Sequence, residues 1–484
     1  MRKSFKTITT GLFFLITLFF IKSSFAGTSL QDNGYEAVPC LMDLRSAFSD
    51  GSHTIEDLAR IAHERGFRVL FINDHDRITL SYGVFPFKNI LRYKKEFPSI
   101  MTNNPEDYLN EIKRVQKQYP DMIIIPGCET SPYYYWTGSW LGQDLTVNGY
   151  DRRILIMNLT EPSDYNLPIL NNGLSLRYTK RLLPGAIIFL FPLIAGIIIM
   201  TVYKRAYILI GSILTLISIL AIIDYNPFRS SPFSPYKGDQ GIAPYQELID
   251  YVNKKGGLSF WNYPEQKSGM REYGPIKTST ATYARVLNES TGYTGFSAIY
   301  GEYTTATKPG REWDLALMEY LAGKRTNPPW GIAAADFHFD GKSGQKLGTY
   351  PTTLLVKEFS KNGIMEALKN GRLYASCGDG IDWPLLTYFN VSGKDKAFMG
   401  ETIVSETSPV ISFRVEYRSA KSEQTTIMLI RGGKLIKTFT GQTPMEIEYT
   451  DTEIPSGEKT FYRIMDNKEH LLSNPIFVTY MPVS

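Results

Sequence analysis

The sequence predicts an α/β fold that is interrupted by two transmembrane helices and followed by an antiparallel β-sandwich. Short strand-like apolar runs alternate with amphipathic helices from about residue 39 to 159 and again after residue 244. Two long charge-free runs lie between these regions. From about residue 383, short alternating runs are separated by Gly, Pro and Ser turns, which is typical of a sandwich.

Composition limits the class of protein before any motif is considered. At 484 residues the chain is too long for one ordinary core, so two or three domains are expected. Hydrophobic residues make up 43% and charged residues 21%, which indicates a folded chain with a membrane contribution. The net charge is only +4, and no Lys/Arg stripe is interleaved with aromatic residues. The sequence therefore indicates no nucleic-acid partner.

The three cysteines, Cys40, Cys128 and Cys377, form no CxxC motif, and an odd, sparse set argues against a disulfide scaffold. One pair could form in an oxidising compartment. Cys40 with Cys128 is the favoured pair, because both fall near the ends of predicted strands.

Residues 1–26 have the order of a secretory signal peptide. A basic segment from Met1 to Lys6 precedes an apolar segment around 12–16, and small residues precede Gly27. We expect cleavage after Ala26. An uncleaved anchor is the alternative, and it would leave the following domain on the same side of the membrane.

The apolar region at residues 182–224 predicts a transmembrane helical hairpin and thus a lipid bilayer as partner. Leu182–Tyr203 suffices for one helix and Ala206–Ile223 for a slightly short second one. A buried hairpin in a soluble core is the alternative, which continuous apolarity on all helix faces disfavours. With Lys204 and Arg205 on the cytoplasmic side, the flanking regions lie on the periplasmic side of the cell membrane.

The soluble elements follow in order. The predicted strands of the α/β region are 41–44, 69–72, 122–125, 257–260 and 331–335, and its predicted helices are 54–65, 105–119, 245–254, 313–322 and 363–370. Their rhythm predicts parallel strands. The predicted domains are 27–181 and 245–382 as two parts of one α/β unit, a hairpin at 182–224, a linker at 225–244 and a sandwich at 383–484, with sandwich strands at 411–417, 425–430, 434–439, 445–449 and 460–465.

Carboxylates and histidines follow several predicted strands. Asp50 lies past the first strand, His75 follows the second, Glu129 ends the third, and Asp336 and His338 follow the strand at 331–335. Strand ends converge on one face of a parallel barrel, so these side chains could meet there. Mixed carboxylate and imidazole ligands suit zinc, manganese or iron. The sequence thus points to a divalent metal, which could activate water or polarise a phosphoryl oxygen.

These residues stand in motifs that resemble the PHP (polymerase and histidinol phosphatase) superfamily, and more narrowly its exported metallohydrolases related to carbaryl hydrolase. The motifs span roughly residues 39–380 without the hairpin, and they are Asp43-Leu44-Arg45-Ser46-Ala47-Phe48-Ser49-Asp50-Gly51-Ser52, Ile72-Asn73-Asp74-His75-Asp76, Pro126-Gly127-Cys128-Glu129-Thr130-Ser131 and Asp336-Phe337-His338. The resemblance implies a distorted (βα)7 barrel. In active members it also implies a centre of two or three metals that hydrolyses phosphoesters or related bonds.

The chain departs from the family pattern at four ligand places. Arg45 and Ala47 replace the two histidines of the opening His-x-His motif, Arg153 replaces another histidine, and Asn262 replaces the histidine of an Ala-His-Pro segment. By the resemblance, the surviving ligand places are Asp50, His75, Glu129, Asp336 and His338. Three of them, Asp50, His75 and His338, correspond to the ligands of a single metal. The resemblance therefore implies one ion at most, or none.

Arg45 and Arg153 admit two interpretations. Their guanidinium groups could neutralise Glu129 and Asp336, which we favour, or they could bind an anionic ligand.

Two functions remain open from the sequence. The first is a membrane-anchored, metal-dependent hydrolase that acts on a phosphoester, amide or carbamate of small-molecule size. The second is a catalytically inactive PHP-fold module that binds or assembles a protein partner at the membrane.

Overall fold

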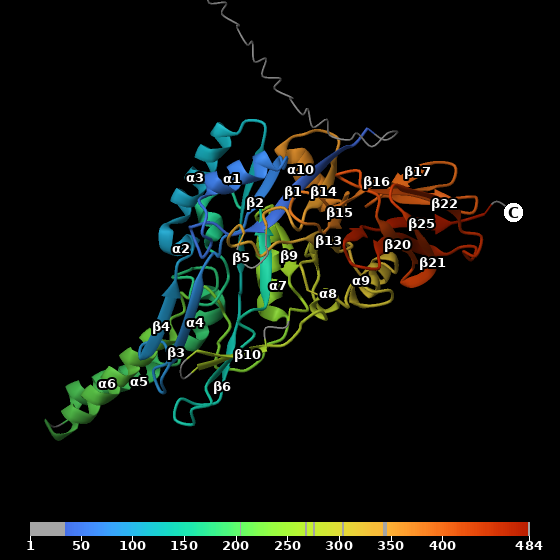
Figure 1. Ribbon diagram of the computed structural model, residues 1–484. Coiled ribbons are helices and arrows are strands. Elements are labelled where there is room, and N and C mark those ends of the chain that lie inside the picture. The colour runs from blue at the N-terminus through green and yellow to red at the C-terminus, as the bar shows by residue number, and fades with distance from the viewer. Residues whose placement is uncertain are drawn as a thin grey trace, which may run out of the picture.

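The computed structural model describes residues 34–203, 205–266, 269–273, 276–302, 304–341 and 346–482. The predicted signal peptide lies outside these residues. Three regions are visible in Figure 1: a mixed α/β body, a pair of helices that project from it, and a C-terminal β-rich region at the opposite side.

The elements before the projecting helices are β1 (Glu36–Leu44), α1 (Ile55–Glu64), β2 (Val69–Ile72), β3 (Ile78–Gly83), β4 (Arg92–Phe97), α2 (Ile100–Asn103), α3 (Pro105–Gln118), β5 (Ile123–Thr130), β6 (Tyr135–Thr137), β7 (Thr146–Asn148), β8 (Arg153–Met157) and a 3-10 turn (Pro162–Tyr165). The projecting helices are α4 (Thr179–Ile187), α5 (Leu190–Val202) and α6 (Arg205–Tyr225).

The body resumes with α7 (Ala243–Lys254), β9 (Leu258–Asn262), β10 (Gly269–Tyr273), β11 (Ile276–Thr280), α8 (Val286–Glu289), β12 (Gly295–Ile299), α9 (Glu312–Leu321), β13 (Trp330–Ala333), β14 (Thr352–Val356), α10 (Lys361–Lys369) and β15 (Leu373–Ser376). The C-terminal strands are β16 (Pro384–Ser392), β17 (Lys396–Phe398), β18 (Thr402–Ser405), β19 (Val410–Tyr417), β20 (Gln424–Arg431), β21 (Lys434–Gln442), β22 (Met445–Thr450), β23 (Lys459–Asp466), β24 (Leu471–Ser473) and β25 (Ile476–Tyr480).

Local sequence signals account for the element ends. Thr54 begins α1, because its hydroxyl accepts a hydrogen bond from the Asp57 backbone N–H while Asp57 reaches back to the Thr54 N–H. The inward face of α1 buries Ile55, Leu58 and Ala62 in the same core as the apolar side chains of β2.

The strands of the body lie in the order β13-β12-β9-β8-β5-β2-β1-β14-β15. β1, β2 and β5 are parallel, as are β9, β12 and β13, in agreement with the predicted rhythm. β8 runs antiparallel to both β5 and β9, and β14 runs antiparallel to both β1 and β15. The connection from β5 to β8 consists of the small antiparallel strands β6 and β7 and contains no crossover helix, so β8 starts at the sheet edge where β5 ends.

The segment after β13 returns to the end of β1. The Phe337 backbone N–H donates to the Asp43 carbonyl at 3.1 Å, and the Arg45 N–H donates to the Phe337 carbonyl at 2.9 Å. These bonds join the two ends of the seven-strand path from β13 to β1. They bring the loops after β1 and β13 together and so assemble the site described below.

Two helical segments, Thr179–Val202 and Tyr207–Tyr225, are long and apolar enough to cross a membrane. Only 17% and 11% of their apolar windows are buried, unlike the core helices of a soluble protein. α5 and α6 pack against each other and project away from the body in Figure 1. A methyl group added at Gly196 would lie 2.9 Å from the Gly211 carbonyl oxygen, so this close packing requires the glycine.

The C-terminal region continues the sheet of the body. β15 pairs with β24, and the path goes on through β23, β20 and β21. A separate sheet of β17, β16, β19 and β22 contributes Phe389 and Phe413 to a core that also holds Ile427 and Ile464 from the first sheet. Two apposed antiparallel layers of this kind are the packing of a β-sandwich.

The cysteine pairing considered above is wrong. Cys40, Cys128 and Cys377 are all free thiols in the structure. Cys40 lies on β1 and Cys128 on β5, and β2 lies between them. Two strand spacings of about 4.8 Å each put the two backbones beyond the reach of a disulfide.

A buried ion pair joins the body to the C-terminal region. Arg463 of β23 donates to both carboxylate oxygens of Asp314 in α9, at 2.7 and 2.8 Å, and both side chains are fully enclosed. An Asp314→Ala variant should lose about 3 kcal/mol of unfolding free energy, since the Arg463 charge would be left buried and unpaired. Denaturant unfolding in detergent, followed by tryptophan fluorescence, measures the loss. A loss below about 1 kcal/mol would contradict this reasoning. The control is Glu64→Ala, which removes the exposed ion pair with Arg60 and should cost less than about 1 kcal/mol.

Candidate metal centre

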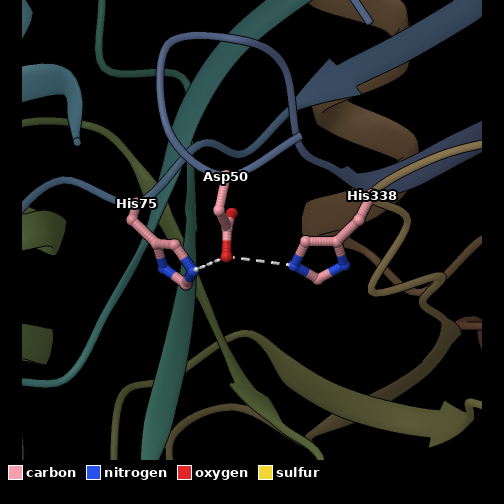
Figure 2. A group of neighbouring side chains, drawn as sticks. All are labelled: Asp50, His75 and His338. Carbon is pink, nitrogen blue, oxygen red and sulfur yellow. Dashed lines mark hydrogen bonds and ion pairs between the residues drawn. The ribbon is translucent and has the colours of Figure 1, made fainter. Parts of the chain in front are cut away.

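Three side chains from separate loops place ligand atoms around one point. Asp50 lies in the loop between β1 and α1, His75 follows β2, and His338 follows β13. The Asp50 Oδ2 atom is 3.4 Å from His75 Nε2 and 3.2 Å from His338 Nε2. Figure 2 shows the carboxylate between the two imidazole rings. All three ligand atoms lie within 4.8 Å of one another, so they could hold one metal ion.

The remote nitrogen of each imidazole has its own acceptor. His338 Nδ1 lies 2.7 Å from the Asp336 carbonyl oxygen, and His75 Nδ1 lies 3.2 Å from Glu129 Oε2. Each acceptor favours a proton on Nδ1 and leaves the Nε2 lone pair directed at Asp50. Metal-binding histidines are typically oriented in this way by a carbonyl or carboxylate. The donor set therefore fits a divalent metal ion.

The loop that carries Asp50 is held by a buried carboxylate. Asp74 accepts hydrogen bonds from the Ser46 N–H at 2.8 Å and from the Ser46 and Ser49 hydroxyls at 2.6 Å each. Gly51 is required in the same loop, because a methyl group there would lie 2.3 Å from the Arg45 carbonyl oxygen. These contacts fix the position of Asp50 relative to His75.

The three ligand side chains differ in their access to solvent. His75 is 5% exposed, whereas Asp50 is 45% and His338 27% exposed. Burial lowers the pKa of His75, which favours the neutral ring that a metal requires. His75 is therefore a buried ligand of the site, whereas Asp50 and His338 face solvent.

Glu129 lies next to this group and is fully buried among cations. Its Oε2 atom is 2.8 Å from Arg45 Nη2 and 2.6 Å from Arg153 Nη1, besides its contact with His75. Burial raises the pKa of Glu129, but Arg153 and Arg45 outweigh that effect and hold it at about 2. Glu129 is therefore an ionised carboxylate, and its Oε2 atom already contacts two guanidinium groups and one imidazole.

Arg45 occupies the centre of a carboxylate cluster. Its guanidinium group bonds to Asp43, and Nη2 lies 3.4 Å from Asp336 Oδ1. The side chain is fully buried. Arg153 reaches Glu129 from the start of β8, and the antiparallel direction of β8 puts that start at the same sheet edge as the end of β5. Both arginines thus face the carboxylates that the charge-neutralising interpretation assigned to them.

Asn262 and Ala47, the other two residues at family ligand positions, do not neutralise carboxylates as the arginines do. Asn262 at the end of β9 receives a hydrogen bond from the Ser297 hydroxyl at 2.5 Å, and its amide donates to Glu129 Oε1 at 2.6 Å. The amide is therefore a donor and not a metal ligand. Ala47 is exposed, and it offers no ligand atom.

Two aspartates complete the site in roles that the sequence did not reveal. Asp43 accepts from the Asn262 amide at 3.0 Å and from the Asp336 N–H at 3.1 Å. Asp43 and Asp336 both have left-handed backbones, with φ of 63° and 44°. Such conformations are strained for these residues and persist where surrounding bonds hold them. Asp43 precedes Arg45 by two residues, so a shared strand face was the only sequence signal for this pair.

Neither known family profiles nor curated protein sequences match this chain. Among solved structures, it is similar to a two-domain protein from Bacteroides vulgatus that contains a predicted PHP-like metal-dependent phosphoesterase. That match has 12% identity and a TM-score of 0.38, and it covers 92% of this chain and 96% of the other.

Two further solved structures are similar to part of this chain. One is named as a metal-dependent phosphoesterase, from Bifidobacterium adolescentis, and the other as an amidohydrolase with bound sulfate, from Chromobacterium violaceum. Each match has 13% identity and a TM-score of 0.27 and covers 63% of this chain, with 89% and 88% of the respective neighbour covered. The neighbours are thus distant proteins whose names are of the hydrolase type.

Proposed function

We propose that this chain is a membrane-anchored, extracytoplasmic metal-dependent hydrolase of the phosphoesterase class. The observation that carries the proposal is the convergence of Asp50, His75 and His338, with both remote imidazole nitrogens already engaged. When bound there, a divalent ion such as zinc, manganese or iron would act as a Lewis acid toward a phosphoryl oxygen and lower the pKa of water. Asp50 and His338 are partly exposed, so a substrate could reach these two ligands from solvent.

The contacts of Glu129 support a single ion. Its Oε2 atom contacts two guanidinium groups, and Asp336 faces Arg45. A second cation beside these carboxylates would be repelled by both arginines. In the proposed site, Arg45 and Arg153 supply the positive charge that further metal ions supply in PHP proteins. Arg153 is also partly exposed, so one edge of its guanidinium can meet an anionic substrate.

The PHP assignment, the distorted (βα)7 barrel and the carbaryl-hydrolase-like branch remain part of this proposal. The order of the motifs supports them, as does the seven-strand path from β13 to β1 with the return of residues 335–337 to the end of β1. The predicted domain limits at 181, 245 and 383 belong to the same proposal.

The proposed topology rests on the pairing of β8 with β9. These strands flank the two apolar helices in the sequence, yet Arg153 pairs with Asn262 and Met157 with Leu258 in one ladder. Both flanking segments must then lie on the same side of a bilayer, so the helices cross it twice. The signal-peptide pattern of residues 1–26 favours the periplasmic side for both segments.

Hydrolysis assays on the full-length protein in detergent test this function. With zinc or manganese added, the wild type should hydrolyse a phosphomonoester or phosphodiester such as a nitrophenyl phosphate. The Asp50→Asn and His338→Ala variants should lose at least about 100-fold in kcat/KM, since each removes a metal ligand. A His63→Ala variant removes an exposed histidine on α1 and should retain the activity. Equal rates in all variants would refute the assignment.

The contacts of the arginines also favour a second candidate, a catalytically inactive PHP-fold module that binds or assembles a protein partner at the membrane. Arg45 and Arg153 saturate the carboxylates of the neighbouring places, which stabilises the fold without any metal. A wild type that binds metal but hydrolyses neither ester, amide nor carbamate substrates would favour this candidate over the hydrolase.

A further inference from the structure

A cavity lies where α6 meets the body. Its volume is about 310 Å³, within the range of small-ligand sites. Ile223 and Tyr225 at the end of α6 form one wall, and the hairpin of β3 and β4 forms another. Figure 1 shows β3 and β4 beside the bases of the projecting helices.

The cavity lining is strongly cationic. It includes Arg77, Arg92, Lys94 and Arg229, and it contains no aspartate or glutamate among the described residues. Glu96 pairs with Arg77 and Lys94 from outside the lining, at 2.5 and 2.9 Å. The remaining two cations have no carboxylate partner in the described chain, so the cavity carries excess positive charge.

Several guanidinium donors in this lining are unused. Arg92 donates to the Asn171 amide oxygen at 3.2 Å, and Arg229 donates only a long bond of 3.4 Å to the Pro232 carbonyl. The Nε atoms of Arg77 and Arg229 are buried and have no hydrogen-bond partner within the described residues. Buried donors of this kind are costly unless an acceptor reaches them.

The cavity lies at the membrane end of the body. The Asp224 carboxylate accepts hydrogen bonds from the Asn89 and Ile90 N–H groups, at 2.6 and 3.1 Å, and so ties the hairpin tip to the last turn of α6. The tip also exposes apolar side chains, and Phe85 is 80% exposed. An apolar tip level with the end of a membrane helix is suited to the lipid interface.

We propose that this cavity binds the phosphate group of an anionic membrane lipid. Guanidinium groups match phosphate oxygens in pairs, and basic pockets beside transmembrane helices bind lipid head groups. The exposed apolar residues Leu174 and Ile223 in the lining favour a ligand that carries an acyl chain over a free phosphate ion.

This binding requires helices α4 to α6 in a bilayer, but it does not require hydrolysis. Arg77 also lines a small cavity of about 20 Å³ beside His75, Glu129 and Arg153. The lipid site therefore adjoins the candidate metal centre. A phosphate-bearing lipid held there is the class of ligand that the proposed hydrolase would be placed to receive.

Native mass spectrometry of the full-length protein, released from phosphatidylcholine nanodiscs that contain phosphatidic acid, tests the proposal. The wild type should retain one phosphatidic acid molecule and no phosphatidylcholine. In parallel nanodiscs that contain oleate, an anionic lipid without phosphate, in place of phosphatidic acid, it should retain no oleate. Occupancy should fall at least tenfold in an Arg92→Gln/Arg229→Gln variant and return in the Arg92→Lys/Arg229→Lys variant. The matched control, Arg60→Gln/Arg114→Gln, removes two exposed arginines on α1 and α3 and should keep the lipid.

Inorganic phosphate, titrated calorimetrically into lipid-free protein, distinguishes the two sources of phosphate. Tight phosphate binding in this titration, together with loss of phosphatidic acid from the nanodisc sample when millimolar phosphate is added, would overturn the lipid assignment. Unchanged lipid occupancy in the Arg92→Gln/Arg229→Gln variant would overturn the site. The Asp50→Asn variant should retain the lipid, so failure of the hydrolase proposal and failure of this one give different results.

Discussion

The full-length protein, purified in detergent and dialysed against trace zinc or manganese, should carry about one metal ion per chain. A His75→Ala/His338→Ala variant should carry less than about a tenth of that amount, because two of three ligands are gone. Elemental analysis by inductively coupled plasma mass spectrometry measures both values. This loss of metal should exceed the loss caused by replacing any other pair of residues in the described chain.

Two controls make this expectation specific. His63→Ala removes a histidine that pairs with Asp121 at the surface, and it should leave the metal content unchanged. Glu129→Gln keeps the ligand set but replaces the carboxylate that orients His75, so metal affinity should fall by about 10- to 100-fold. A metal-free wild type, or equal metal in the double variant, would contradict the site and leave the inactive module as the better account.

The second large effect concerns stability. Replacing Glu129 by Gln should lower the unfolding free energy by about 3 kcal/mol, at the lower end for a buried ion pair, because Arg45 keeps Asp43 and Asp336 as partners. Two guanidinium groups would lose their shared counter-charge, and the Arg45 side chain has no exposure to water. Denaturant unfolding followed by tryptophan fluorescence measures the change. Glu111→Gln, which breaks an exposed pair with Arg114, should cost less than about 1 kcal/mol.

The pKa of Glu129 also defines the pH range over which this carboxylate contributes to the unfolding free energy. The folded-state pKa of Glu129 is about 2, below the ordinary value of 4.5. Its contribution is therefore complete above that ordinary value and is lost as the pH falls toward 2. The wild type should lose stability over this range by more than the Glu129→Gln variant does. Parallel acid dependence in the two proteins would show that Glu129 is not the group responsible.

Local patterns allowed much of the fold to be predicted. The cap at Thr54, the strand at 69–72 and the short strands after residue 410 each depend on side chains close in sequence, and their ends agree with the structure within a few residues. The direction of β8 depends on its partners far along the chain. β8 was not among the predicted strands, and its apolar run fits a parallel or an antiparallel neighbour equally well, so the rhythm that predicted parallel strands could not reveal its reversed direction.

The site was predictable in its outline for a similar reason. Asp50, His75 and His338 each follow a strand, and strand ends at one edge must meet. The partners of Arg45 could not be ranked from the sequence, because Asp43, Glu129 and Asp336 all lie at that edge. The unused donors of Arg77 and Arg229 also depend on how the hairpin of β3 and β4 folds against the end of α6. Such relations arise only from tertiary packing.

The ladder between β8 and β9 also imposes an order on biosynthesis. In the proposed topology, the edge of β8 that will pair with β9 is bare when β8 leaves the ribosome, and it stays bare while both apolar helices are made and inserted. A bare strand edge can pair with other chains. In that topology, correct insertion of both helices is a checkpoint for the sheet, since a chain that inserted only one of them would leave β9 on the wrong side of the bilayer. Such a chain can complete neither the sheet nor the metal site.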